Sequence, residues 1–135
     1  MKVAPVMNAL KTRKHVVQTL VHTGQHYDAN MSDVFFEQLG IPPPDVNLAA
    51  GSGDTCSADR RNHDSFRDGA VGSQADIVLV DGDVNSTVAT ALICDKLGVR
   101  VGHVEAGLRS FDRTMPEEIN RLVSDQVADL LFTPS

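Results

Sequence analysis

The first third of the chain shows two different spacings of apolar residues. Apolar side chains at i, i+3, i+4 and i+7 predict a helix over residues 3–10, and a β-branched stretch predicts a strand over residues 15–23. The helical spacing returns over residues 28–39, where Gly40 ends it. Because three consecutive prolines cannot continue a helix, residues 41–44 are expected to form a rigid extended connection.

The second half alternates short apolar runs with amphipathic stretches. The continuous apolar run at residues 76–80 is typical of a strand buried on both faces, and it is followed by a predicted helix over residues 85–97. A strand at residues 99–104, a helix from Pro116 and a strand at residues 129–133 complete the pattern. This alternation predicts an α/β fold, a doubly wound parallel sheet with helices on both faces.

Polar side chains follow three of the predicted strands. Gln25 and His26 come after the first of these strands, Asp83 after the second and Glu105 after the third. In a parallel sheet the carboxyl ends of the strands lie at one edge, where ligands bind. The topology alone therefore predicts that these four side chains converge on a site.

Composition and charge exclude several classes of protein. The 135 residues, 41% hydrophobic and 22% charged, suffice for one domain with a core. A net charge of −6 without any Lys/Arg run argues against a nucleic-acid partner. The absence of a long apolar run argues against membrane contact, and without a secretory signal we expect a cytoplasmic location. Cys56 and Cys94 cannot build a disulfide framework, which suits a reducing compartment.

The carboxylates at the strand ends have structural as well as functional interpretations. Asp83 suits either a ligand site or the N-cap of the following helix. Glu105 would be costly to bury unpaired, so it either faces a ligand or pairs with Arg109 or His103.

Glu117 and Glu118 have a structural interpretation of their own. Both suit the positive end of the helix that begins at Pro116, and Glu117 is spaced for an i, i+4 pair with Arg121.

Metal and cofactor signals are weak. His22, His26 and His103 are not accompanied by the second pair of closely spaced ligands that would make a metal site specific. The Asp81-Gly82-Asp83 tripeptide is similar to the metal-holding Asp-x-Asp pair of some glycosyltransferases, although it is common by chance. No dinucleotide or P-loop motif occurs, so we expect neither a metal nor a cofactor.

Four segments taken together resemble the non-hydrolysing UDP-N-acetylglucosamine (UDP-GlcNAc) 2-epimerases. They are HTGQHYD at 22–28, GDVNST at 82–87, HVEAGLRS at 103–110 and MPEEINR at 115–121. The likeness extends over residues 2–53 and 75–135. It implies a GT-B-like enzyme of two Rossmann-like domains, usually a homodimer, that interconverts UDP-GlcNAc and UDP-N-acetylmannosamine (UDP-ManNAc) by eliminating and re-adding UDP.

The resemblance also implies roles for particular residues. The catalytic carboxylates would be Asp83, Glu105 and Glu117. The remaining assignments are a substrate-binding set of Lys2, Arg109, Glu118 and Arg121, and a second-substrate or activating site at Gln25 and His26.

Two departures from the family pattern set further expectations. The family begins with an additional strand and a Gly-Thr-Arg-Pro-Glu loop and ends with a UDP-binding domain, so residues 1–135 would be a partial N-terminal domain that is inactive alone. Residues 54–73 carry seven charged side chains in place of the family's helix. We hypothesise a pair of compensating frameshifts there, because a shifted reading frame restores an amphipathic helix.

Three other functions stay open at this point. One is a hydrolysing epimerase that releases UDP, and another is a GT-B glycosyltransferase with a metal at Asp81 and Asp83. The third is a non-catalytic domain that binds a nucleotide sugar or a partner protein.

Overall fold

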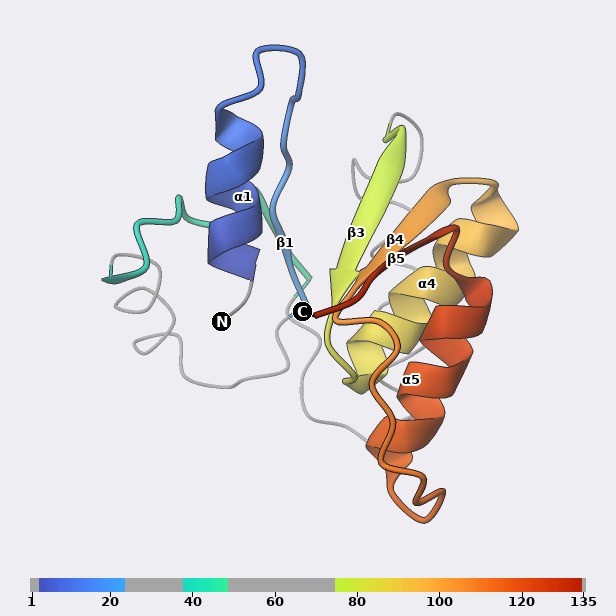
Figure 1. Ribbon diagram of the computed structural model, residues 1–135. Coiled ribbons are helices and arrows are strands. Elements are labelled where there is room, and N and C mark those ends of the chain that lie inside the picture. Colours follow the sequence, from blue (N-terminus) through green and yellow to red (C-terminus); the bar gives the residue numbers. More distant parts are fainter. Residues whose placement is uncertain (1–2, 24–37, 49–74, 135) are drawn as a thin grey trace. The chain divides into compact units, whose positions relative to one another are not determined.

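The computed structural model describes residues 3–23, 38–48 and 75–134 of the chain. The chain divides into two compact units, Met1–Ser52 and Gly53–Ser135. The fold in both units is α/β with parallel strands, as predicted (Figure 1).

The first unit contains helix α1 (Val3–Lys11) and two short parallel strands, β1 (Val21–His22) and β2 (Val46–Asn47). Its core consists of Ala4 and Met7 from α1, packed with Ile41. The predicted helix over residues 3–10 is confirmed, whereas β2 was not predicted because a two-residue strand leaves no periodic signal.

The strand predicted over residues 15–23 is much shorter in the structure. The N–H of Leu20 donates to the Asp45 carboxylate at 2.7 Å instead of joining the ladder, which begins only at Val21. Val17, before it, is 95% exposed and therefore has no apolar neighbour to hold it in a sheet. The helix predicted over residues 28–39 lies almost wholly outside the described residues.

The second unit is a sheet of three parallel strands in the order β3 (Ile77–Asp81), β4 (Arg100–Val104) and β5 (Leu130–Phe132). Helix α4 (Asn85–Leu97) connects β3 to β4, and helix α5 (Pro116–Val127) connects β4 to β5. The elements predicted in this half are confirmed, with shifts of about one residue at strand ends.

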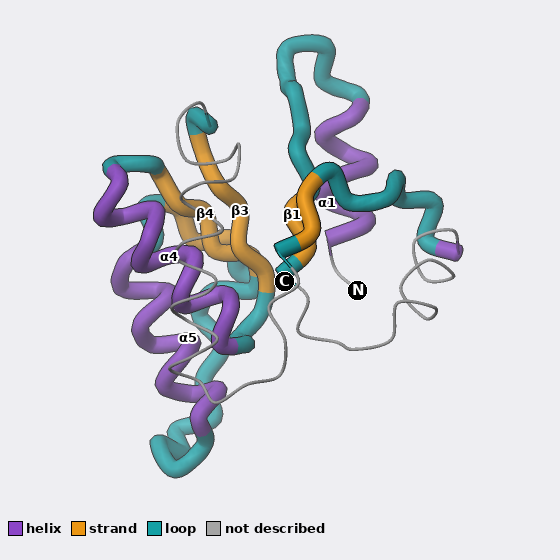
Figure 2. Tube along the Cα trace, turned by 180° about the vertical axis from the view of Figure 1, so that it is seen from behind, coloured by secondary structure: helices purple, strands orange, loops and turns teal. Residues whose placement is uncertain are grey.

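Helices α4 and α5 pack against each other and against the same face of this sheet (Figures 1 and 2). Small side chains on α4, such as Ala91 and Cys94, are fully buried and permit this close packing. The helices described for this unit therefore cover one face, although the sequence predicted helices on both. None of the described helices is long and apolar enough to cross a membrane.

Candidate active site

The carboxyl ends of β3 and β4 meet at one edge of the sheet. Asp81 is paired in register with Val104, and the N–H of Gly82 donates to the Val104 carbonyl oxygen at 3.3 Å. Gly82 has a φ of +78°, a conformation that favours glycine and turns the chain sharply away from the strand. The turns that carry Asp83 and Glu105 therefore begin side by side, as the topology predicted.

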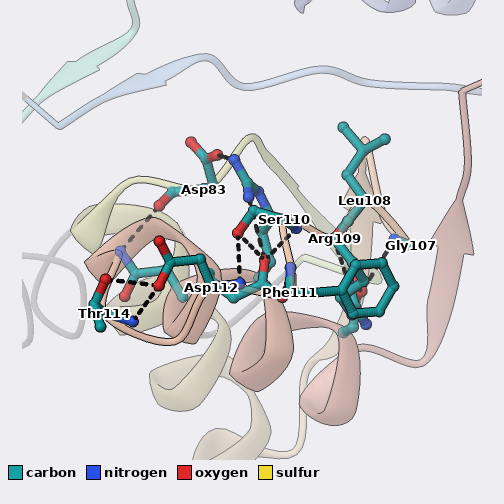
Figure 3. A network of polar contacts seen from close by, with 12 residues as sticks. Asp83, Gly107, Leu108, Arg109, Ser110, Phe111, Asp112 and Thr114 are labelled. Atoms are coloured by element: carbon teal, nitrogen blue, oxygen red, sulfur yellow. Dashed lines mark hydrogen bonds and ion pairs between the residues drawn. The ribbon is translucent and has the colours of Figure 1, made fainter.

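Asp83 is held by helix α5. Its Oδ2 lies 2.5 Å from Nη2 of Arg121, and its carbonyl oxygen accepts a hydrogen bond from Asn120 at 2.9 Å (Figure 3). The hydrogen bond from Arg121 to Asp83 raises the pKa of the guanidinium above its ordinary value. The N-cap interpretation of Asp83 is wrong, because the N-cap of α4 is Val84 and no side chain caps the helix.

Glu118 joins α5 to the loop that follows β4. Its carboxylate accepts hydrogen bonds from the Ser110 N–H at 2.9 Å, the Ser110 hydroxyl at 3.1 Å and the Phe111 N–H at 3.2 Å. Arg121 adds a contact at 3.3 Å, and Glu118 is only 2% exposed. The hydrogen bond from the Ser110 N–H is the main reason why the pKa of Glu118 lies below its ordinary value, against the opposing effect of burial.

The loop between β4 and α5 is also fixed by contacts of its own (Figure 3). The Asp112 carboxylate accepts hydrogen bonds from the hydroxyl of Thr114 at 2.6 Å and from its N–H at 3.0 Å, which lowers the pKa of Asp112. Phe111 has a positive φ of 59° and its side chain is 89% exposed. Because a bulky residue rarely adopts this backbone conformation, the surrounding hydrogen bonds must hold it there.

Asp125, on the same face of α5 as Glu118 and Arg121, organises the beginning of that loop. Its Oδ2 lies 2.6 Å from Nη1 of Arg109 and accepts the Gly107 N–H at 3.0 Å, while its Oδ1 lies 2.6 Å from Nδ1 of His103. Burial opposes ionisation of Asp125, but these three donors together keep its pKa below the ordinary value. His103 and Arg109 thus share Asp125 as a partner.

Two other predicted carboxylates differ in their surroundings. Glu105 is half-buried directly after β4 and has a positive φ of 69°, which is unusual for a side chain larger than Asn. Glu117 is exposed in the first turn of α5, and within the described ranges no hydrogen bond or ion pair involves it. The expected i, i+4 pair of Glu117 with Arg121 does not form, because Arg121 contacts Asp83 and Glu118 instead.

The structure therefore brings part of the predicted site together. Asp83, Glu118 and Arg121 are in one network, and Glu105 and Arg109 belong to the adjoining turn. The roles of all these residues stay predictions. Lys2, Gln25 and His26 lie outside the described residues.

Sequence reasoning missed Asp125, Asn120 and Ser110. A signal for Asp125 existed, because residues 118, 121 and 125 follow the i, i+3, i+7 spacing of one helix face. Asn120 and Ser110 are connected to the site only by tertiary contacts, to Asp83 and Glu118 respectively.

The arrangement suits acid–base chemistry by carboxylates. Over residues 3–23, 38–48 and 75–134, no group of three His, Cys, Asp or Glu side chains is placed to hold a metal ion. Carboxylates that are held by arginines and backbone N–H groups, next to an exposed glutamate, can give and take protons at a bound substrate.

Sequence comparison relates the chain to one enzyme family. The family profile described as UDP-N-acetylglucosamine 2-epimerase matches residues 8–135. A UDP-N-acetylglucosamine 2-epimerase homolog of Methanococcus maripaludis is 46% identical over 134 residues, which cover 99% of this chain and 37% of that protein. A UDP-2,3-diacetamido-2,3-dideoxy-D-glucuronate 2-epimerase of Pseudomonas aeruginosa is 48% identical over 134 residues, covering 99% and 38%.

Solved structures agree with this relationship. The UDP-GlcNAc 2-epimerase of Methanocaldococcus jannaschii in complex with UDP-GlcNAc and UDP matches with a TM-score of 0.92 and 42% identity, over 99% of this chain and 37% of that one. The UDP-GlcNAc 2-epimerase of Neisseria meningitidis bound to UDP-GlcNAc matches with a TM-score of 0.89 and 28% identity, over 99% and 36%. The predicted GT-B-like class is confirmed, and the chain spans little more than a third of these relatives.

Proposed function

Because the chain belongs to the UDP-N-acetylglucosamine 2-epimerase family, we propose that it supplies the carboxylate-bearing part of an enzyme that interconverts UDP-GlcNAc and UDP-ManNAc. The observation that carries this proposal is the match over residues 8–135, which includes the network joining Asp83, Glu118 and Arg121. Structures of relatives with UDP-GlcNAc support the choice of substrate.

The chemistry requires at least two groups that exchange protons with carbon C2 of the sugar. A C2 proton is a poor acid until the bond from C1 to the UDP oxygen weakens, after which a carboxylate can remove it. Elimination then leaves UDP and a 2-acetamidoglucal, and the reverse addition of UDP, with protonation from the other face, inverts C2. Each well-placed acid or base contributes typically about 10² to 10⁴ in rate.

We assign this acid–base chemistry to Asp83, Glu105 and Glu117. Asp83 is oriented by Arg121 at 2.5 Å, Glu105 follows β4 in a turn next to that of Asp83, and Glu117 is exposed in the first turn of α5.

The other predicted residues support these groups in the proposal. Arg109 and Arg121 orient carboxylates, Asp125 and Asp83 respectively. Glu118 is buried, and its carboxylate accepts hydrogen bonds from the backbone of the loop after β4. We therefore propose that Glu118 holds this loop in place and does not contact the substrate directly. Lys2 in the substrate site, Gln25 and His26 in a second-substrate site, and a homodimer of the full-length enzyme are proposed from the family resemblance.

A chimera tests the function. This chain replaces the matching segment of the M. jannaschii enzyme, and the purified protein is incubated with UDP-GlcNAc. Formation of UDP-ManNAc without accumulation of free UDP is expected, and the 135-residue chain alone is expected to be inactive. Release of UDP and free N-acetylmannosamine would indicate a hydrolysing epimerase, and transfer of the sugar would indicate a glycosyltransferase.

A second candidate substrate is a UDP-2,3-diacetamido-2,3-dideoxy-glucuronate. It is favoured by the 48% identity to the P. aeruginosa enzyme that is named for this sugar. The chain is placed in both the M. jannaschii and the P. aeruginosa backgrounds, and each chimera is assayed with both sugars. A preference that follows this chain in both backgrounds identifies its own contribution to specificity.

A further inference from the structure

His103 lies beneath α4 and α5 and is 1% exposed. Its Nε2 is 2.9 Å from the Gly82 carbonyl oxygen, and its Nδ1 is 2.6 Å from Oδ1 of Asp125. A carbonyl oxygen and a carboxylate only accept hydrogen bonds. The two ring nitrogens of His103 therefore connect the Gly82 carbonyl oxygen with the Asp125 carboxylate.

The other oxygen of Asp125 holds the turn after Glu105. It accepts the N–H of Gly107 at 3.0 Å and lies 2.6 Å from Nη1 of Arg109. Glu105 and Gly107 both have positive φ, with the fully buried Ala106 between them. A glutamate in this backbone conformation persists only where its surroundings over-determine it, and the hydrogen bond to Gly107 does so.

A continuous path of hydrogen bonds thus joins two turns. It runs from the Gly82 carbonyl through His103 and Asp125 to the Gly107 N–H. Gly82 directly precedes Asp83, and Gly107 is two positions after Glu105. The path therefore fixes the positions of the two turns relative to each other.

We propose that His103 and Asp125 are positioning residues, which set the separation of the Asp83 and Glu105 carboxylates for the C2 epimerisation. The effect of this pair on catalysis rests on the proposed function, whereas the hydrogen-bonded path between the two turns does not. Reacting groups must be placed closely, and a misplacement of about 1 Å can cost about 10² in rate. The pair is expected to affect kcat, because neither residue is placed to contact the substrate directly.

The chain offers a matched control in Asp129. Its Oδ2 accepts the N–H of Val101 at 2.8 Å, near the amino ends of the strands and away from both turns. Asp125→Asn and Asp129→Asn are the same chemical change in the same unit, and each weakens a hydrogen bond to backbone. A purely structural role for Asp125 would leave the kcat of both folded variants unchanged.

The test measures kcat and KM of both variants in the M. jannaschii chimera, well below their unfolding temperatures. Asp125→Asn is expected to lower kcat about 10- to 100-fold with little change in KM, and Asp129→Asn is expected to leave kcat unchanged. In the unmutated chimera, ¹⁵N NMR of His103 is expected to show that both ring nitrogens take part in hydrogen bonds. Equal kcat for the two variants, or a His103 ring nitrogen outside any hydrogen bond, would overturn the proposal.

The two proposals can fail separately. If the unmutated chimera does not epimerise UDP-GlcNAc, the proposed function fails. The amide signals of Gly82 and Gly107 then test whether His103 and Asp125 connect the two turns. Asp125→Asn is expected to shift both signals, and Asp129→Asn neither. If Asp125→Asn does not fold, the hydrogen bonds of the His103 ring in the unmutated protein still test the inferred path.

Discussion

Arg121 on α5 donates a hydrogen bond at 2.5 Å to Asp83, which is 38 positions earlier in the chain. The same guanidinium contacts Glu118 at 3.3 Å, and Glu118 holds the backbone of Ser110 and Phe111. One arginine therefore connects the turn after β3 with the loop after β4. The geometry of the candidate site depends on this connection.

Replacing Arg121 by lysine should impair catalysis more than binding. A single ammonium group lacks the planar fork that contacts Asp83 and Glu118 together, so Asp83 should lose its fixed orientation. We expect a lower kcat for Arg121→Lys in the M. jannaschii chimera. Arg113→Lys is the control, because Arg113 is exposed in the loop and is not part of the network. Equal kcat for both variants would contradict this role of Arg121.

Glu117 and Glu118 are adjacent, but replacing Glu117 should affect catalysis whereas replacing Glu118 should affect stability. Glu117→Gln should lower kcat by about 10² to 10⁴, as expected for a lost acid or base, with an unchanged unfolding temperature. Glu118→Gln should lower the unfolding temperature, because a neutral amide is a weaker acceptor for the Ser110 and Phe111 N–H groups. Thermal unfolding and steady-state kinetics of both variants check this. A stability loss in Glu117→Gln would argue that its carboxylate is structural.

Acid should destabilise the loop that follows β4. The hydrogen bond from Ser110 lowers the pKa of Glu118 from its ordinary value of 4.5. Hydrogen-bond donors around Asp112 and Asp125 likewise lower the pKa values of these two carboxyl groups. A carboxyl with a lower pKa in the folded state stabilises that state above the unfolded pKa, and this contribution is lost as pH falls through the folded pKa. The unfolding temperature should therefore fall below pH 4.5, and the fall should be less steep in Glu118→Gln than in Glu117→Gln. Parallel curves for the two variants would contradict this.

Cys94 should be unreactive until the second unit unfolds. Its side chain is fully buried, and burial raises the pKa of the thiol to about 11, so little thiolate exists at neutral pH. In a Cys56→Ser variant, a thiol reagent should modify Cys94 only in denaturant, in step with unfolding followed by circular dichroism. Fast labelling under native conditions would show that α4 opens locally.

Elements with a local signal could be predicted from the sequence. The bounds of α4 were predicted because apolar spacing is ended there by Gly98, which has a positive φ of 72°. The length of β1 could not be predicted, because it depends on Asp45, which accepts the Leu20 N–H from 25 positions away.

The candidate site could also be predicted only in part. The convergence of Asp83 and Glu105 followed from the order of strands and helices. The pairing of Arg121 with Asp83 could not be predicted in this way. Glu117 is the neighbour of Arg121 at i, i+4, whereas Asp83 comes within reach only after β3 and β4 have paired. His103 and Asp125 depend likewise on the packing of α5 over β4.

The measurement that tests the central claim most directly is deuterium incorporation at C2 of the sugar. The M. jannaschii chimera that contains this chain is incubated with UDP-GlcNAc in D₂O, and the products are followed by NMR. Inversion through proton removal and return predicts UDP-ManNAc with deuterium at C2, and the Asp83→Asn, Glu105→Gln and Glu117→Gln variants should each slow its formation. UDP-ManNAc that retains its original C2 proton, or no turnover by a folded chimera, would contradict the assignment of these carboxylates to C2 epimerisation.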